Sequence, residues 1–324
     1  MTQIAMQTNP VAAAHTAPAT ASHAAIACEH ITKRFGSRVA VHDVSLRLES
    51  GTVTGLVGLN GAGKSTLLRM MMGLTASTSG RVLLRGIDVA RNPIDARKDV
   101  AFVPDKPNAF PWMRVREIMD LCSKLQPSWS VETAHRLMQQ YRLDATQRVS
   151  KLSKGQGAKL SLLLALAQQP DILVLDEPTD GLDPIARDEF LEEVIRAVSE
   201  RDRLTILISS HALDELERII DHVALMHEGG LVLHTNAEQL LKMTKRVSAV
   251  LDDAVKFEPP GCIFTRREGH SVTWTLRSCD QSVLSLIAAT PGVRDVQSHD
   301  MRLVDVFKDV VRGVQEQSAE KGGA

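Results

Sequence analysis

Hydrophobic residues form short continuous runs in the second half of the chain, separated by stretches with helical spacing. The clearest runs are Ile172–Leu175, Leu204–Ile208 and Val223–Met226. Strands without polar alternation are typical of a parallel sheet that is covered on both faces. Residues 228–230, which read EGG, predict a hairpin turn into a further strand. The pattern therefore predicts an α/β fold built around a mixed, mainly parallel sheet.

The first half of the chain predicts a strand, a turn, a second strand and a helix. Loose alternation over residues 39–48 suits a strand, Gly51 marks a turn, and residues 52–57 are β-branched and apolar. Helical spacing follows over residues 65–74, with Gly73 as the expected C-terminal cap. This order of elements places the glycine-rich segment 58–66 between a strand and a helix.

Changes in composition divide the chain into four parts. Residues 1–25 contain no charged side chain and are expected to form a disordered tail. Residues 26–245 carry the sheet pattern and include an inserted helical subdomain at about residues 106–165. Residues 246–313 alternate short strands, such as 271–276, with helices, which predicts a small C-terminal α/β extension. Its last helix is expected to carry Leu303, Val306, Phe307, Val310 and Val311 on one face, and residues 314–324 are expected to be a second tail.

Composition excludes several classes of protein. The 324 residues hold 38 Lys and Arg against 39 Asp and Glu, a balance that gives no basic field for non-specific binding of nucleic acid. Apolar runs are too short for a membrane-spanning helix, which needs about 20 residues. The 4 cysteines form no CxxC pair and predict reduced thiols of a cytosolic protein rather than a disulfide framework or a zinc site.

The segment 58–66 reads GLNGAGKST and carries phosphate-binding chemistry. Gly58, Gly63, Lys64 and Ser65 satisfy the pattern GxxxxGK[ST]. Glycines let backbone N–H groups approach phosphate oxygens, and the following helix directs its positive N-terminus at the same oxygens. The lysine adds a full positive charge, and the serine hydroxyl is suited to bind Mg²⁺. These residues predict a nucleotide phosphate site.

A second site is expected where the apolar run 172–175 ends in two carboxylates, Asp176 and Glu177. The carboxyl ends of strands are where open α/β sheets bind their ligands. Since successive strand side chains point in opposite directions, the two acids are expected to have different roles. Asp176 is suited to the Mg²⁺ shell, and Glu177 to polarising an attacking water.

Three further segments carry a resemblance to a known family. They read LSKGQ at 152–156, DEPTDGLDP at 176–184 and ISSH at 208–211. Together with the phosphate loop they resemble, in the same order, the motifs of ATP-binding cassette (ABC) ATPases: the signature, the D-loop and the switch histidine. The resemblance covers roughly residues 27–240, and the chain looks like a single nucleotide-binding subunit of an ABC transporter.

The resemblance implies a head-to-tail dimer, a homodimer or a heterodimer, with two ATP molecules held between the subunits. Ser153 and Gly155 would contact the γ-phosphate of the partner's nucleotide, and Asp183 would lie at the dimer seam. The expected catalytic residues are Glu177 and His211. The expected Mg²⁺ ligands are Ser65, Asp176 and Asp105. The residues expected to bind ATP are Phe35, which would stack on adenine, and Gly58, Leu59, Asn60, Gly61, Ala62, Gly63, Lys64, Ser65, Thr66, Ser153, Gly155, Gln156 and Asp183.

Two positions depart from the family pattern. Asp105 stands where the family often has a glutamine, which puts the coupling between nucleotide and partner in doubt at that position. Lys154 stands in the signature where glycine is usual, and a positive charge near a phosphate is expected to be tolerated.

The leading hypothesis is an ATP-hydrolysing subunit of an exporter, peripheral on the inner face of the cell membrane, with the permease as a separate chain. The segments 104–119 and 301–311 resemble the bacterial exporter type. One alternative is a soluble ABC ATPase that acts on ribosomes or DNA. A single phosphate loop and a short interval before the signature disfavour it. Another alternative, a nucleotide-dependent switch without catalysis, is disfavoured by the presence of Glu177 and His211.

Overall fold

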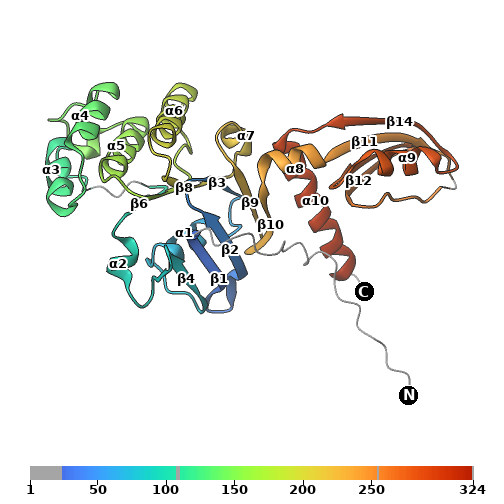
Figure 1. The fold of residues 1–324 in the computed structure, drawn as a ribbon, viewed down its shortest axis with the longest axis horizontal. Coiled ribbons are helices and arrows are strands. Elements are labelled where there is room, and N and C mark those ends of the chain that lie inside the picture. Colours follow the sequence, from blue (N-terminus) through green and yellow to red (C-terminus); the bar gives the residue numbers. More distant parts are fainter. Residues whose placement is uncertain (1–23, 107–109, 254, 323–324) are drawn as a thin grey trace, which may run out of the picture.

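The computed structural model describes residues 24–106, 110–253 and 255–322. A six-stranded sheet lies at its centre, and two four-stranded sheets lie beside it. Figure 1 shows a group of helices at one end of the molecule and the C-terminal sheet at the opposite end. The fold is the mixed α/β architecture that the hydrophobic pattern predicts.

The central sheet has the strand order β10-β9-β3-β8-β7-β6, and neighbouring strands are parallel except for the β9–β10 hairpin. Its strands are β3 (Val53–Val57), β6 (Val100–Val103), β7 (Ile172–Asp176), β8 (Thr205–Ser210), β9 (His222–His227) and β10 (Gly230–Asn236). The predicted strands over 52–57, 172–175, 204–208 and 223–226 and the predicted hairpin are confirmed.

Both faces of the central sheet are buried, which explains the continuous apolar runs. On β7, Leu173 and Leu175 belong to one hydrophobic cluster, whereas Ile172 and Val174 belong to another. All four side chains are fully buried because alternate residues point to opposite faces, each covered by other elements.

One face is covered by helix α1 (Lys64–Met71) and an antiparallel sheet of order β2-β1-β4-β5. Its strands are β1 (Ala24–Phe35), β2 (Arg38–Glu49), β4 (Ser79–Leu84) and β5 (Ile87–Asp88), and α2 (Pro93–Arg97) lies next in the chain. The strand predicted at 39–48 is confirmed as β2. The tail predicted over 1–25 lies outside the described residues, except that residues 24 and 25 begin β1.

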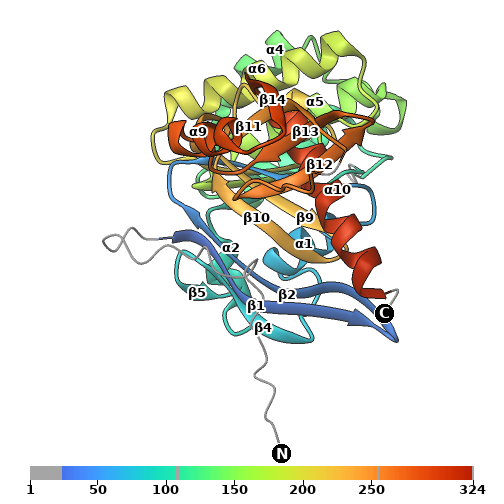
Figure 2. The same ribbon diagram turned by 90° about the vertical axis from the view of Figure 1, so that its right-hand side faces the viewer.

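The other face is covered by helices from the predicted helical subdomain and the segment after it. They are α3 (Val115–Leu125), α4 (Val131–Gln140), the 3-10 helix η2 (Val149–Lys151), α5 (Lys154–Ala167) and α6 (Pro184–Glu200). Figure 2 shows α4, α5 and α6 on one side of the central sheet and β1, β2 and β4 on the other. The oxygens of Ser130 and Ser153 cap α4 and α5, so each helix starts at a hydroxyl side chain.

The C-terminal part forms its own antiparallel sheet of order β12-β13-β11-β14 with a separate small core around Trp274. Its elements are β11 (Lys245–Leu251), β12 (Cys262–Glu268), β13 (Ser271–Leu276), α9 (Gln281–Ala289), β14 (Val293–Asp300) and α10 (Leu303–Gly322). Helix α8 (Ala237–Met243) connects it to β10 of the central sheet, whereas α7 (Leu213–Leu216) lies between β8 and β9.

Helix α10 differs in two ways from the sequence prediction. Its apolar residues Leu303, Val306, Val310 and Val311 pack into the core that contains β7 and α7, not into the C-terminal core. The helix also continues to Gly322, so the tail expected from residue 314 is helical over 314–322. The reason is local composition, because Val, Gln, Glu, Ser, Ala and Lys in this stretch include no helix breaker before the final glycines.

Candidate nucleotide-binding site

The phosphate loop connects the end of β3 to the start of α1, as predicted. A Cβ atom on Gly58 would lie 2.5 Å from the carbonyl oxygen of Met226, and one on Gly63 would lie 2.5 Å from that of Ala40. Gly63 also has a φ of +100°, which favours glycine. The first turn of α1 carries no acidic side chain. The loop therefore leads into a helix N-terminus that attracts anions.

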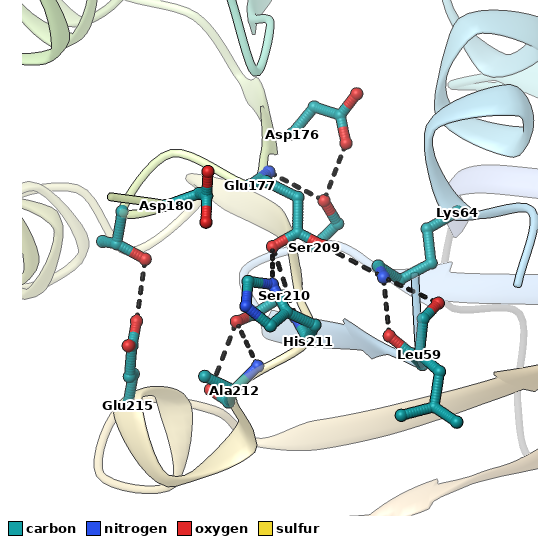
Figure 3. A network of polar contacts seen from close by, with 12 residues as sticks. Leu59, Lys64, Asp176, Glu177, Asp180, Ser209, Ser210, His211, Ala212 and Glu215 are labelled. Carbon is teal, nitrogen blue, oxygen red and sulfur yellow. Dashed lines mark hydrogen bonds and ion pairs between the residues drawn. The ribbon is translucent and has the colours of Figure 1, made fainter. Parts of the chain in front are cut away.

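Lys64 is a buried cation at the base of this loop, with 5% of its surface exposed. Its Nζ donates to the carbonyl oxygen of Gly58 over 2.6 Å and forms an ion pair with Glu177 Oε1 at 2.9 Å. Figure 3 shows the ammonium between the loop and Glu177. Burial of a charge requires such partners, and both are groups that phosphate oxygens can replace.

Asp176 ends β7 and is almost completely buried. Its Oδ1 accepts hydrogen bonds from Ser65 Oγ at 3.0 Å and from Ser209 Oγ at 2.9 Å. Burial raises the pKa of this carboxyl, and the nearby charges of Glu177 and Asp105 raise it further, while the two hydroxyl donors oppose the shift. A cation at this position would relieve the cost of burying the charged form.

Glu177 is the first residue after β7, and its side chain points away from that of Asp176 (Figure 3). Its Oε2 lies 2.8 Å from His211 Nδ1, and the backbone N–H of His211 donates to the same oxygen over 3.3 Å. The Glu177 backbone has a φ of +46°, an uncommon conformation for a residue with a side chain. Its N–H donates to Ser209 Oγ of β8, so β8 holds the backbone in place while His211, the residue after β8, holds the carboxylate. Strained backbone supported in this way is frequent at functional sites.

These groups surround a pocket of about 530 Å³. Among the predicted site residues, the pocket is lined by Phe35, Asn60, Gly61, Ala62, Gly63, Lys64, Ser65, Thr66, Asp105, Glu177 and His211. Gly58, Leu59 and Asp176 do not line the pocket but form hydrogen bonds with Lys64 or Ser65, which do. The structure therefore brings most of the predicted binding, catalytic and metal residues into one cavity.

Three lining residues were missed from the sequence: Arg38, Ala40 and Asp180. Asp180 lies within the D-loop segment 176–184, so its position could have been read from the motif. Arg38 and Ala40 follow Phe35 at the start of β2, where no single-sequence signal distinguishes them from other strand residues.

The signature residues do not line this pocket. Ser153 caps α5, and its Oγ accepts from the Gln156 N–H while its own N–H donates to Gln156 Oε1. Gly155 packs near Ala186, and Asp183 caps α6 through the Ala186 N–H. All four residues are held on the edge formed by the starts of α5 and α6. None of the four lines the nucleotide pocket of its own chain.

The pocket fits a nucleotide with a divalent cation. Ser65, Asp176 and Asp105 offer the hydroxyl and carboxylate oxygens that Mg²⁺ prefers. Within the described part of the chain, no three His, Cys, Asp or Glu side chains are placed to hold a metal. Magnesium bound by a few protein oxygens together with substrate phosphates and water is the usual arrangement in such sites.

A phosphate loop at the end of a parallel strand, facing an acidic strand end, defines a P-loop nucleotide-binding protein. A family model described as ABC transporter matches residues 41–180. The chain is 31% identical to the bacitracin transport ATP-binding protein BcrA of Bacillus licheniformis, over 67% of this chain and 71% of that protein. The chain therefore belongs to the ATP-binding subunits of ABC transporters, as the sequence motifs indicated.

Further comparisons agree. The chain is 37% identical to the Nod factor export ATP-binding protein I of Burkholderia lata, over 62% of this chain and 67% of that protein. A solved ATP-binding subunit of an ABC transporter superposes with a TM-score of 0.61 at 25% identity, covering 67% of this chain and 92% of the other. None of the helices within residues 24–106, 110–253 and 255–322 has the length and apolar character needed to cross a lipid bilayer.

Proposed function

We propose that this subunit binds Mg²⁺ and ATP, hydrolyses ATP in a head-to-tail dimer, and drives an exporter whose permease is a separate chain. The observation that carries the proposal is the position of Glu177, whose carboxylate contacts Lys64 on one side and His211 on the other. This arrangement places a carboxylate, an imidazole and a phosphate-binding cation around one point of the pocket.

In this proposal Glu177 polarises the attacking water, and His211 holds the carboxylate in position through its Nδ1 contact. Lys64 and the N-terminus of α1 bind the phosphate chain. Ser65, Asp176 and Asp105 hold Mg²⁺, which neutralises phosphate charge when bound. The ring of Phe35 is 53% exposed at the pocket mouth, and Lys33 Nζ lies 4.9 Å from its centroid. One face of the ring remains for adenine to stack on.

The dimer is proposed because Ser153, Gly155, Gln156 and Asp183 lie on an edge apart from the chain's own pocket. A second subunit in head-to-tail orientation would bring that edge to the nucleotide. A solved dimeric bacterial ABC transporter cassette has the same fold, with a TM-score of 0.59 at 22% identity.

Export and the permease are proposed from the relatives, whose names describe bacitracin transport and Nod factor export. These relatives favour a transporter over the alternatives of a ribosome-acting or DNA-acting ATPase. The subunit would then lie on the inner face of the membrane, attached to its permease.

The test measures phosphate release from ATP and Mg²⁺ as the concentration of the full chain increases. The proposal predicts that specific activity rises with protein concentration as dimers form. Activity per subunit that is the same in dilute monomer contradicts the shared site. The permease is tested by purifying the tagged Glu177→Gln variant from detergent-solubilised host membranes in the presence of ATP and Mg²⁺. A stoichiometric integral membrane protein should co-purify, whereas recovery of ribosomes or nucleic acid contradicts the transporter proposal.

A further inference from the structure

Lys154, which stands where the family usually has glycine, makes a contact that links the signature to the D-loop of the same chain. Its Nζ lies 3.3 Å from Asp180 Oδ2, and the two side chains are 56% and 46% exposed. The lysine passes over Gly181, where a Cβ atom would lie 2.4 Å from Nζ. Gly181 has a φ of +62°, so both the backbone conformation and the passing side chain favour glycine there.

The other end of this ion pair belongs to the nucleotide pocket. Asp180 lines the pocket together with Glu177 and His211, and its backbone N–H donates to the Glu177 carbonyl oxygen over 3.1 Å. A carboxylate in the wall of a pocket for phosphates repels the ligand. Lys154 supplies the opposite charge next to this carboxylate.

We infer that Lys154 is a positioning residue that holds and neutralises Asp180, and thereby connects the signature segment to the nucleotide pocket of its own chain. Because Lys154 is flanked by Ser153 and Gly155, a partner's nucleotide at the signature would compete with Asp180 for the same ammonium. A triphosphate carries more negative charge than one carboxylate, so it would draw the lysine away. This link between the two sites rests on the proposed dimer, whereas neutralisation of Asp180 does not.

The charges determine whether nucleotide binding at the signature strengthens or weakens binding in the chain's own pocket. When the partner's nucleotide attracts Lys154, Asp180 loses its neutralising partner and repels phosphates in its own pocket. Binding at one site therefore lowers the affinity of the other. Replacing Asp180 with Asn removes the repulsion and with it this negative coupling.

The test is a double-mutant cycle on ADP binding by the full chain, because ADP affinity requires neither hydrolysis nor a dimer. Lys154→Met should weaken ADP binding about two- to fivefold, the range of an exposed ion pair. In the Asp180→Asn background the same substitution should have no effect, and Lys154→Arg should restore wild-type affinity. Equal weakening in both backgrounds, or no weakening at all, overturns the inference.

A matched control comes from Arg218 and Asp188, whose atoms lie 3.2 Å apart and whose side chains are 52% and 58% exposed. Arg218→Met and Asp188→Asn should leave ADP affinity unchanged, since neither residue lines the pocket. A loss of affinity in these variants would show that any exposed ion pair has this effect, and would overturn the inference.

The link between sites is tested by the dependence of ATP hydrolysis on ATP concentration. The Hill coefficient of Asp180→Asn should exceed that of the wild type, and equal coefficients overturn the link. Failure of the proposed function can be distinguished from failure of this inference. A wild type that hydrolyses no ATP refutes the proposed function, whereas the double-mutant cycle on ADP binding can still give the expected result.

Discussion

The phosphate pocket and the signature edge, which is formed by the starts of α5 and α6, use the same kinds of residue. Contacts between distant parts of the sequence hold the pocket, whereas contacts within one helix start hold the edge. In the pocket, Lys64 and Asp176 are nearly fully buried, and each contacts groups from distant parts of the sequence. At the signature edge, Ser153 and Asp183 bond to backbone N–H groups three residues along their own helices. One chain completes the first region by itself, whereas in the proposed dimer the second region presents groups that act on the partner's nucleotide.

This contrast separates the functions that depend on one subunit from those that depend on two. Long-range contacts fix the pocket geometry before any partner binds, so nucleotide binding should be a property of the monomer. The signature edge is stable as a pair of helix starts without any nucleotide. Hydrolysis should therefore respond to changes in either region. Binding by the monomer should respond to changes in the pocket and, at the signature edge, only to changes at Lys154, which pairs with Asp180 of the pocket.

The largest effect is expected from Glu177→Gln, which removes the carboxylate that contacts both Lys64 and His211. Hydrolysis should fall about 10²- to 10⁴-fold, the usual contribution of a general base, while ATP binding persists and dimers accumulate. Phosphate release and size-exclusion chromatography measure the two results. The control is Glu228→Gln, because Glu228 has the same φ of +46° but is exposed and outside the pocket. Unchanged hydrolysis in Glu177→Gln would show that Glu177 is not the general base.

The next effect is expected from Lys64→Ala. This change removes the buried cation of the pocket and leaves Glu177 without its ion-pair partner, so nucleotide affinity should fall about 100-fold or more. Titration with a fluorescent nucleotide gives the affinity of the monomer. Lys245→Ala is the matched control, since Lys245 also pairs with a carboxylate, Asp300, but lies in the C-terminal sheet. Similar losses in both variants would contradict the assignment of Lys64 to phosphate.

Ser153→Arg tests the signature edge. The bulky side chain should block approach to a partner's nucleotide and lower hydrolysis about 10- to 100-fold, while monomer ATP affinity stays unchanged. Loss of a cap by itself destabilises a helix by about 1 kcal/mol. Ser130→Arg corrects for this, because Ser130 caps α4 in the same way but lies outside the signature. If Ser153→Arg weakens binding by the monomer, the separation of the two regions is wrong.

The smallest effect is expected from Phe35→Ala at the pocket mouth. Loss of one stacking face should weaken ATP and ADP binding about two- to tenfold. Competition by inorganic triphosphate, which has no base, should be unchanged, and Phe35→Tyr should keep full affinity. Equal loss for triphosphate would show that Phe35 supports the loop rather than the adenine ring.

Most of the pocket could be predicted because its residues fall in contiguous motifs at the ends of continuous apolar strands. The positions of Lys64, Ser65, Asp176 and Glu177 followed from the segments 58–66 and 172–177 alone. Arg38 could not be predicted, because it reaches the pocket through the hairpin between β1 and β2 rather than through a motif. Pairing across the chain depends on tertiary packing, which a single sequence does not reveal.

The partner of Lys154 shows the same limit. The sequence revealed an unusual lysine in the signature, but the contact with Asp180 depends on how the start of α5 packs beside the start of α6. In the C-terminal part, the strand at 271–276 and the apolar stripe of the last helix were predicted. The packing of this α10 stripe against the ATPase core was not predicted, because an apolar stripe shows that one face of a helix is buried but not which element covers it.

The placement of α10 has a consequence for how the molecule unfolds. Its apolar face shares a core with Leu213 and Leu216, and the N–H of Leu303 donates to Glu217 Oε1 over 2.9 Å. A chain that ends before Leu303 would expose this part of the core to water. The C-terminal sheet and the ATPase body should consequently melt in one cooperative transition, although each has a hydrophobic cluster of its own.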